Sequence, residues 1–298
     1  MKIIVTGSES FVGREFIAQC LKEGVEVFGF DLAKSSDLPY TFQKGDINDP
    51  KIGDIFPEGA DALVHLAALS RDKDCAGRAY ECFWTNVMGT LNLVQAAKAR
   101  GVKQFIFSSS EWVYEKFAPG EMKDEASLID IAGHTSEYAL SKLVSEANLR
   151  QEYLRDPSMG ITVLRFAIIY GPRPLDVAGS VERIMGEAKT SDVMTFSGSR
   201  KSGRCYIHVH DIARGIRAAL GRKDFQIINL AGDEFITLED IVRITEKLCD
   251  KAKPAEIIEK DTAAIVARNI SNKKAKELLS WKPEIDIESG FKTILPFI

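Results

Sequence analysis

The sequence has few cysteines and histidines, and neither set has the spacing of a disulfide framework or a metal site. The five cysteines are odd in number and include no Cys-x-x-Cys pair, a scatter typical of apolar thiols in a reducing compartment. None of the four histidines has zinc-ligand spacing with a cysteine. His208 and His210 would form a metal pair only if both rings shared one face of a strand, and a structural role is favoured. We therefore expect no metal.

Long apolar segments and dense basic runs are also missing. No apolar run is long enough to cross a bilayer, and the chain enters a strand-like segment after Met1-Lys2 without a basic leader, which predicts a cytoplasmic protein. The formal net charge is −4, and the lysines at 273, 274 and 276 have the spacing of a solvated helix face. These features argue against nucleic acid and membranes as partners, whereas a few arginines could still hold an anionic ligand.

Apolar, β-branched segments alternate with helix-like segments up to about residue 170. The spacing of Val87, Leu91, Val94 and Ala97 marks the buried stripe of a long helix. Nearly continuous apolar strands that alternate with helices are typical of a parallel sheet covered on both faces, so we predict a doubly wound α/β fold. The expected strands span 2–6, 25–30, 62–66, 104–108 and 161–166.

The pattern becomes irregular beyond residue 170. The run Gly171-Pro172-Arg173-Pro174 interrupts it, residues 197–203 form a polar loop, and short helices are expected at 238–248 and 273–279. We predict a first domain at 1–170, to which 207–230 return, and a smaller C-terminal α/β cap at 171–298 over the carboxyl ends of the strands.

A turn with two glycines, TGSESFVG at residues 6–13, follows the first expected strand. Gly7 permits a tight turn, Gly13 permits close packing of helix on sheet, and the helix N-terminus offers free N–H groups to a pyrophosphate. Ser10 occupies the usual place of a middle glycine, and Glu9 adds a negative charge to the loop. Taken alone, the motif also fits a plain βα turn.

An acidic residue at the end of the second strand favours a bound dinucleotide. Asp31 can accept hydrogen bonds from both ribose hydroxyls, and its carboxylate repels a 2′-phosphate. Asp46 and Ile47, after a third short extended segment, are placed to contact an adenine. The predicted cofactor is therefore NAD rather than NADP.

The strongest catalytic signal is the pair Tyr138 and Lys142. Four residues apart on a helix, they share one face. The ammonium, helped by the positive charge of an oxidised nicotinamide, should favour the phenolate and lower the tyrosine pKa from about 10. The alternative is an exposed helix pair without function. Upstream, the run Ser108-Ser109-Ser110 ends a strand, where one of its hydroxyls could relay a proton to Tyr138. A serine run also fits plain strand-end turn chemistry, but its position before the Tyr138 helix favours function.

Together these residues resemble the extended short-chain dehydrogenase/reductase family, which contains NAD-dependent nucleotide-sugar epimerases, dehydratases and reductases. The resemblance covers essentially the whole chain, and its motifs are specific when taken together. They are TGSESFVG at 6–13, GDI at 45–47, VHLAA at 64–68, NVMGTLNLVQAA at 86–97, SSSEWVY at 108–114, YALSK at 138–142, LRFAIIYGPR at 164–173, RCYIHVHDIA at 204–213 and KAKELLSWKP at 274–283.

The resemblance implies a Rossmann-type NAD-binding domain at 1–170 and a mainly substrate-binding cap at 171–298. It also implies a homodimer that pairs through the helices carrying residues 86–100 and 138–153. Lys142 would have two roles: it would act as the electrostatic partner of Tyr138 and would also bind the nicotinamide ribose. The positions expected to contact or support NAD are Gly7, Ser10, Phe11, Val12, Gly13, Asp31, Asp46, Ile47, Leu66, Ala67, Ala68, Asn86, Ser108, Tyr138, Lys142 and Ile168.

On the substrate side, the resemblance implies that Arg204 grips a nucleotide diphosphate, with Arg268 as a second ligand, and that Glu111 and Trp112 adjoin the sugar. Trp112 stands where family dehydratases and decarboxylases carry a glutamate, so dehydration lacks its expected base. Glu111 could replace that glutamate only if the turn rotated. Ile168 also departs from the family, which often has asparagine there, and His210 replaces a frequent aspartate.

Three functions remain open at this point. A nucleotide-sugar 4-epimerase and a 4-ketoreductase (or dehydrogenase) need the same Ser110, Tyr138 and Lys142. Asp31 favours the epimerase, which recycles NAD, because cytosolic reductases often use NADPH. A catalytically silent NAD-sensing protein is disfavoured because it would not need to keep all three groups.

Overall fold

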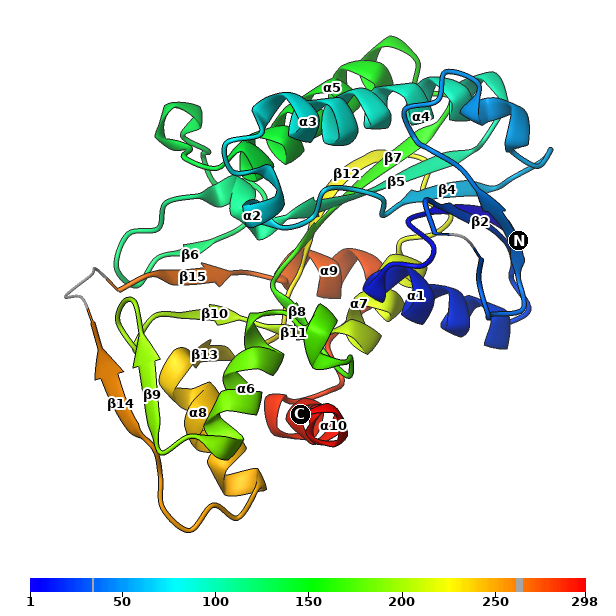
Figure 1. The fold of residues 1–298 in the computed structure, drawn as a ribbon. Coiled ribbons are helices and arrows are strands. Elements are labelled where there is room, and N and C mark those ends of the chain that lie inside the picture. The colour runs from blue at the N-terminus through cyan, green and yellow to red at the C-terminus, as the bar shows by residue number, and fades with distance from the viewer. Residues whose placement is uncertain (34, 261–264) are drawn as a thin grey trace.

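A parallel sheet of seven strands forms the centre of the computed structural model, which describes residues 1–33, 35–260 and 265–298 (Figure 1). Its strands are β1 (Lys2–Thr6), β2 (Glu26–Asp31), β3 (Thr41–Lys44), β4 (Ala62–His65), β5 (Gln104–Ser110), β7 (Gly160–Phe166) and β12 (Phe225–Leu230). The order is β12-β7-β5-β4-β1-β2-β3, and all neighbours run parallel. The order reverses between β1 and β4, the kind of switch point at which open α/β sheets bind ligands beyond the carboxyl strand ends.

Helices cover both faces of this sheet, because successive residues of a strand point to opposite sides. In β1, Ile3 and Val5 pack in one apolar cluster with α1 (Phe11–Lys22) and α7 (Val209–Ala218). Ile4 packs in a second cluster with α4 (Gly89–Ala99) and α5 (Glu137–Arg155). Figure 1 shows the two layers of helices on opposite sides of the sheet. The predicted doubly wound, Rossmann-type α/β fold is confirmed.

Smaller sheets and further helices gather on one side of the large sheet (Figure 1). Their bounds, with those of two short helices on the α5 side, are β6 (Met122–Lys123), β8 (Ile169–Tyr170), β9 (Val193–Phe196), β10 (Gly203–Cys205), β11 (Ile207–His208), β13 (Phe235–Thr237), β14 (Glu256–Glu259), β15 (Ala267–Ile270), α2 (Asp72–Cys75), α3 (Ala79–Phe83), α6 (Ser180–Thr190), α8 (Leu238–Leu248), α9 (Lys273–Leu279) and α10 (Ile287–Ile294). One sheet has the order β13-β10-β15-β6, and β11 pairs with β8 and β14 with β9. The helices predicted at 238–248 and 273–279 are confirmed as α8 and α9.

Strands cross the expected boundary at residue 170 in both directions. β6 precedes it in the chain yet pairs with β15, whereas β12 follows it yet completes the large sheet beside β7. The large sheet and the smaller sheets are therefore each built from distant parts of the chain. The assignment of residues 1–170 to NAD and of 171–298 to the substrate stays a prediction.

The single long helix expected around Val87–Ala97 is interrupted. A π-helical turn at Trp84–Met88 separates α3 from α4. Val87, Val94 and Ala97 are buried, but Leu91 is half-buried. The buried face of α4 is instead formed by Gly89, Thr90, Leu93, Val94 and Ala97. No helix in the described part of the chain combines the length and the apolar character that crossing a membrane requires.

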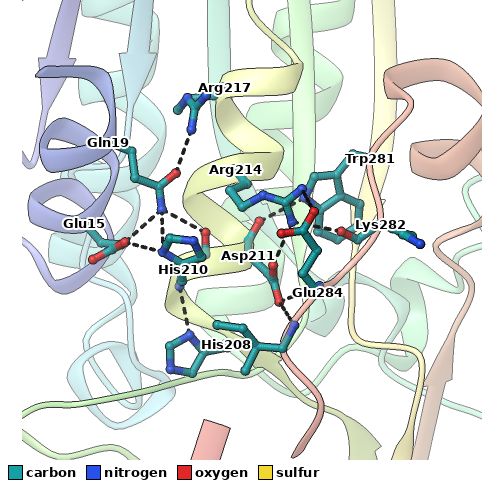
Figure 2. Close-up of polar contacts among 11 residues, drawn as sticks. Glu15, Gln19, His208, His210, Asp211, Arg214, Arg217, Trp281, Lys282 and Glu284 are labelled. Carbon is teal, nitrogen blue, oxygen red and sulfur yellow. Dashed lines mark hydrogen bonds and ion pairs between the residues drawn. The ribbon is translucent and has the colours of Figure 1, made fainter. Parts of the chain in front are cut away.

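Polar contacts fix the start of α7 (Figure 2). His208 ends β11, and its Nδ1 accepts a hydrogen bond from the backbone N–H of His210 at 3.2 Å. The His210 ring instead faces α1, where its Nδ1 lies 2.8 Å from Glu15 Oε1. The expectation that both rings could share a strand face is therefore wrong, because the strand ends at His208 and the helix begins at Val209.

Asp211 attaches the segment after α9 to α7. Its fully buried carboxylate accepts hydrogen bonds from the backbone N–H groups of Glu284 (3.1 Å) and Ile285 (3.0 Å). The Trp281 indole donates to the Asp211 carbonyl oxygen at 3.1 Å, and Arg214 contacts the carboxylate at 3.0 Å (Figure 2). One side chain thus joins the C-terminal segment to a helix that covers the large sheet.

Asp211→Ala should lower the free energy of unfolding by about 2–4 kcal/mol, because it leaves two part-buried N–H groups without an acceptor and Arg214 without its buried partner. Urea unfolding followed by circular dichroism measures this loss. Glu284→Ala is the matched control, since the Glu284 side chain is 55% exposed in its ion pair with Arg214 and should cost under about 1 kcal/mol. Equal losses in the two variants would contradict the role given to Asp211.

Candidate active site

A cavity of about 1250 Å³ opens at the carboxyl ends of β1, β2, β4, β5 and β7. It gathers most of the positions predicted from the sequence. Those that line it are Gly7, Ser10, Phe11, Val12, Asp31, Asp46, Ile47, Leu66, Ala67, Ala68, Ser108, Ser110, Trp112, Tyr138, Lys142 and Ile168. Gly13, Asn86, Glu111, Arg204 and Arg268 do not line it and lie behind or beside its wall.

The turn after β1 leaves no room for side chains on its inner side. Gly7 has a φ of +67°, and a Cβ there would lie 2.6 Å from the Ala67 nitrogen. A Cβ at Gly13 would lie 2.3 Å from the Gly7 carbonyl oxygen. Ser10 caps α1, and its Oγ accepts a hydrogen bond from the Gly13 N–H at 3.0 Å. This bare backbone at a helix N-terminus fits a pyrophosphate, although the Ser10 hydroxyl already engages one N–H group.

Asp31 ends β2 with its carboxylate at the cavity wall. Its Oδ2 accepts a hydrogen bond from the Glu9 N–H at 3.1 Å, and its Oδ1 accepts one from the Ala33 N–H at 3.0 Å. These bonds orient the carboxylate and leave lone pairs on both oxygens for ribose hydroxyls. The turn and Asp31 therefore fit the two ends of an adenosine diphosphate.

Tyr138 and Lys142 project from the start of α5 toward the end of β5. They are only 8% and 3% exposed. The Lys142 Nζ donates a hydrogen bond to the Ser108 carbonyl oxygen at 2.7 Å and lies 6.0 Å from the centroid of the Tyr138 ring. The Ser110 hydroxyl accepts a hydrogen bond from the Trp112 N–H at 3.3 Å and lies near enough to Tyr138 to lower its pKa in part. The fold therefore brings the three groups expected to act together to one wall of the cavity.

Burial controls the protonation of this pair. It raises the pKa of Tyr138 to about 12, and the nearby Ser110 hydroxyl opposes that shift only in part. Burial also lowers the pKa of Lys142 to about 8. Among the groups of the chain itself, the desolvation of a phenolate outweighs its polar contacts. The lowered tyrosine pKa expected beside an oxidised nicotinamide stays a prediction. The positive charge of an oxidised nicotinamide acts in the opposite direction.

A buried ion pair behind these residues was not evident from the sequence. Glu146 follows Lys142 by one helical turn, and both of its carboxylate oxygens accept hydrogen bonds from Arg165 of β7, at 3.0 and 2.6 Å. The Ser109 hydroxyl donates to Glu146 at 2.5 Å. The side chains of Glu146 and Arg165 are 4% and 3% exposed. In the sequence, only the four-residue spacing of Glu146 from Lys142 indicated that Glu146 lies on the same face of the helix.

Asn86 supports the site from the α4 side. It is buried, and its amide donates hydrogen bonds to the Leu69 carbonyl oxygen and to the Ser141 hydroxyl, both at 3.0 Å. Leu69 belongs to the segment after β4 that lines the cavity, and Ser141 precedes Lys142 on α5. Asn86 therefore ties the wall of the cavity to the helix that carries Tyr138.

Two arginines flank Trp112 beside the cavity. Their guanidinium carbons lie 5.5 Å (Arg204) and 4.6 Å (Arg268) from the centroid of its ring. Arg204 Nη1 donates to Glu111 Oε1 at 2.8 Å, so the fully buried Glu111 faces this arginine and not the cavity. Within the described residues, Nε and Nη1 of Arg268 are buried without a hydrogen-bond partner. Burial, followed by the charge of Arg204, lowers the pKa of Arg268.

Comparison with known proteins identifies one family. Residues 3–231 match the NAD dependent epimerase/dehydratase family. The chain is 29% identical over 310 residues to the UDP-glucuronate 4-epimerase of Thermodesulfobacterium geofontis, and the alignment covers 97% of this chain and 93% of that protein.

Solved structures share the fold along the whole chain. The UDP-glucose 4-epimerase of Thermotoga maritima with UDP-glucose has a TM-score of 0.88 at 24% identity, over 100% of this chain and 98% of that one. The UDP-glucose 4-epimerase of Thermus thermophilus in complex with NAD has a TM-score of 0.84 at 25% identity, with the same coverage.

Replacing Ser10 by glycine should leave NAD affinity unchanged or make it up to about tenfold tighter. The substitution frees the Gly13 N–H for a phosphate oxygen and removes a Cβ from the turn, and one net hydrogen bond corresponds to that range. Equilibrium binding of NAD measures the effect. Ser10→Ala, which loses the hydroxyl but keeps the Cβ, is the control. A large loss of affinity in both variants would show instead that the hydroxyl binds phosphate directly.

Proposed function

The chain belongs to the NAD dependent epimerase/dehydratase family, and from this membership we propose that it is a nucleotide-sugar 4-epimerase that acts by transient oxidation at C4. It is an NAD-dependent enzyme, as the resemblance predicted. One observation carries the proposal: Ser110, Tyr138 and Lys142 share a cavity with the glycine turn and Asp31. The similar proteins named UDP-glucuronate 4-epimerase and UDP-glucose 4-epimerase support the substrate class and the position of the chemistry.

Tyr138 is the proposed acid and base. It removes the proton of the sugar C4 hydroxyl, while Ser110 hydrogen-bonds the same oxygen and orients it. Lys142 holds the nicotinamide ribose, and its ammonium stabilises the phenolate. NAD, when bound, exchanges a hydride with C4 and brings a positive charge that opposes the effect of burial on Tyr138. After the sugar has turned over in the cavity, C4 presents its other face to the nicotinamide. Tyr138 then returns the proton to the C4 oxygen.

The proposed cofactor contacts follow the carboxyl ends of the strands. The turn at residues 7–13 binds the pyrophosphate, Asp31 binds the adenosine ribose, and Asp46 with Ile47 contacts the adenine. Residues 66–68 together with Ser108 and Ile168 line the remaining length of the NAD site, and Asn86 supports it from behind.

The proposed substrate contacts are Trp112 in the cavity wall and two arginines beside it, from residues 171–298, which contribute most of the cap. Arg204 and Arg268 bind the diphosphate, for which paired guanidinium groups are suited, and Trp112 contacts the sugar. The hydrogen bond between Glu111 and Arg204 means that a diphosphate must share or displace this carboxylate. The unpartnered Arg268 nitrogens support an anionic ligand, because a buried cation without acceptors is costly.

Two other reactions are less well supported. A dehydratase needs a base where this chain has Trp112, and the neighbouring Glu111 is committed to Arg204. A 4-ketoreductase would use the same Ser110, Tyr138 and Lys142, and only the fate of the hydride distinguishes it. A silent NAD-sensing protein would not need this set of three groups.

Turnover by the purified protein without added reductant tests the proposal. NMR should detect interconversion of C4 epimers when UDP-glucose, UDP-glucuronate and other nucleotide sugars are offered singly. No interconversion of C4 epimers, together with product that forms from a 4-keto nucleotide sugar only in proportion to supplied NADH, would establish the ketoreductase. Tyr138→Phe should keep the fold and NAD affinity, whereas turnover should fall by about 10²–10⁴, the usual contribution of a positioned acid–base group.

The variant Lys142→Met separates the proposed role of Lys142 from that of Tyr138. It should raise the pKa of Tyr138, which moves the rising limb of the pH–rate curve to higher pH, and it should also weaken NAD binding. Tyr138→Phe should erase the limb and leave NAD binding intact. Near-parental turnover in both variants would reject the proposed chemistry.

We also propose a homodimer, for which exposed apolar side chains before α4 provide support. Tyr80, Trp84 and Met88 follow one another at one-turn spacing and are 77%, 47% and 48% exposed. The rings of Tyr80 and Trp84 stack 6.4 Å apart. Such a stripe beside the helices expected to pair is typical of an interface. Light scattering should give twice the chain mass of 33.0 kDa.

Trp84→Glu should shift this dimer toward the monomer, because it places a charge in the apolar contact. Leu128→Glu is the matched control, since Leu128 is 92% exposed and lies outside these helices. A parent protein of 33.0 kDa at micromolar concentration would reject the dimer.

A cytoplasmic location is proposed as well. The five cysteines are free thiols, which is the usual state in a reducing compartment.

A further inference from the structure

The carboxylate of Glu9, in the glycine turn, is held by two neighbouring side chains. Its Oε2 accepts a hydrogen bond from Arg14 Nη1 at 2.6 Å, and its Oε1 accepts one from the Tyr40 hydroxyl at 2.5 Å. The same Arg14 nitrogen lies 2.7 Å from Asp37 Oδ1. One guanidinium thus faces two carboxylates. The Glu9 side chain is only 11% exposed and that of Arg14 is 39% exposed.

This cluster adjoins the place proposed for the adenosine ribose. The backbone N–H of Glu9 donates to Asp31 Oδ2 at 3.1 Å, so the turn and the ribose carboxylate are directly joined. Glu9, Arg14 and Asp31 all line the same cavity, together with Ala33 and Leu38 from the loop after β2. Arg14 is therefore a cation that is linked through Glu9 to Asp31, the residue proposed to contact the 2′-hydroxyl.

Both members of the pair are ionised at neutral pH. Burial opposes ionisation of Glu9, but hydrogen bonds with Ser36, Tyr40 and Arg14 lower its pKa overall. The hydrogen bond with Asp37 raises the pKa of Arg14 despite burial, and Glu9 adds to this effect. A free guanidinium beside a ribose is the group that a 2′-phosphate binds best, because it forms charge-assisted, bidentate hydrogen bonds. Here the chain itself supplies the competing carboxylates.

We propose that Glu9 is a second determinant of cofactor choice, which excludes NADP by holding Arg14 in an ion pair with the help of Asp37. Asp31 repels a 2′-phosphate by its own charge. Glu9 acts differently, because it occupies the one nearby guanidinium in the described residues that line this part of the cavity. Glu9→Gln keeps an acceptor for Tyr40, removes the charge that holds Arg14, and makes the guanidinium available to the phosphate.

Cofactor exchange measures this effect without any knowledge of the sugar substrate. The purified holoenzyme is equilibrated with mixtures of NAD and NADP, and the bound nucleotides are quantified by chromatography. The parent should retain NAD. Glu9→Gln should shift the ratio of dissociation constants toward NADP by about tenfold, the size expected for one partly buried ion pair. Asp37→Asn should shift it in the same direction by less, because Asp37 is 78% exposed.

Two further variants separate the ion pair from a general charge effect. Glu9→Gln combined with Arg14→Gln should return the ratio to that of the parent, since the guanidinium that would accept the phosphate is gone. Glu15→Gln removes the same charge from α1, which follows the turn and lines the same cavity, and should leave the ratio within about twofold of the parent.

Two results would overturn the proposal. One is an unchanged ratio in both Glu9→Gln and Asp37→Asn. The other is a gain for NADP that persists in the double variant, because Arg14 would then play no part. If Glu9→Gln fails to fold, Asp37→Asn in the presence and absence of Arg14→Gln gives the same comparison.

Discussion

The buried ion pair between Glu146 and Arg165 is the interaction on which the geometry of the site depends. It joins α5 to β7 and, through Ser109, to β5. Lys142 and Tyr138 lie one and two turns before Glu146 on the same helix, so the pair holds them against the end of β5. A buried ion pair is costly to break, because the partner that remains keeps an uncompensated charge in the apolar interior. This cost favours the position of α5 that keeps Glu146 against Arg165.

Three arginines in or beside the cavity are paired with carboxylates of the chain itself. Arg14 contacts Glu9, Arg173 contacts the buried Glu182, and Arg204 contacts Glu111. Under the proposed function, an anionic ligand would compete with these internal partners, and each pair would then help to set which phosphate groups are accepted. Specificity of this kind depends on the arginine N–H groups that carboxylates of the chain already bind, as much as on the N–H groups that remain for a ligand.

The features that the sequence predicted well are those that depend on neighbouring residues. Strand alternation gave the doubly wound class, because a parallel sheet must bury both faces of each strand. Gly7 predicted the tight turn, since its positive φ is a local property. The four-residue spacing of Tyr138 and Lys142 predicted a shared helix face for the same reason. The break before α4 was missed, because a regular period carries no sign of a π-helical turn.

The sequence by itself therefore determined the class of the fold, the place of the glycine turn and the Tyr138–Lys142 pair. Only the tertiary structure decided the electrostatics. It placed Glu111 against Arg204, 93 positions along the chain, and Arg14 against Glu9, and it buried Tyr138 so deeply that its pKa rises to about 12. Ion pairing and desolvation depend on which distant segments meet and on how much water they exclude, and no local pattern of residues encodes either quantity.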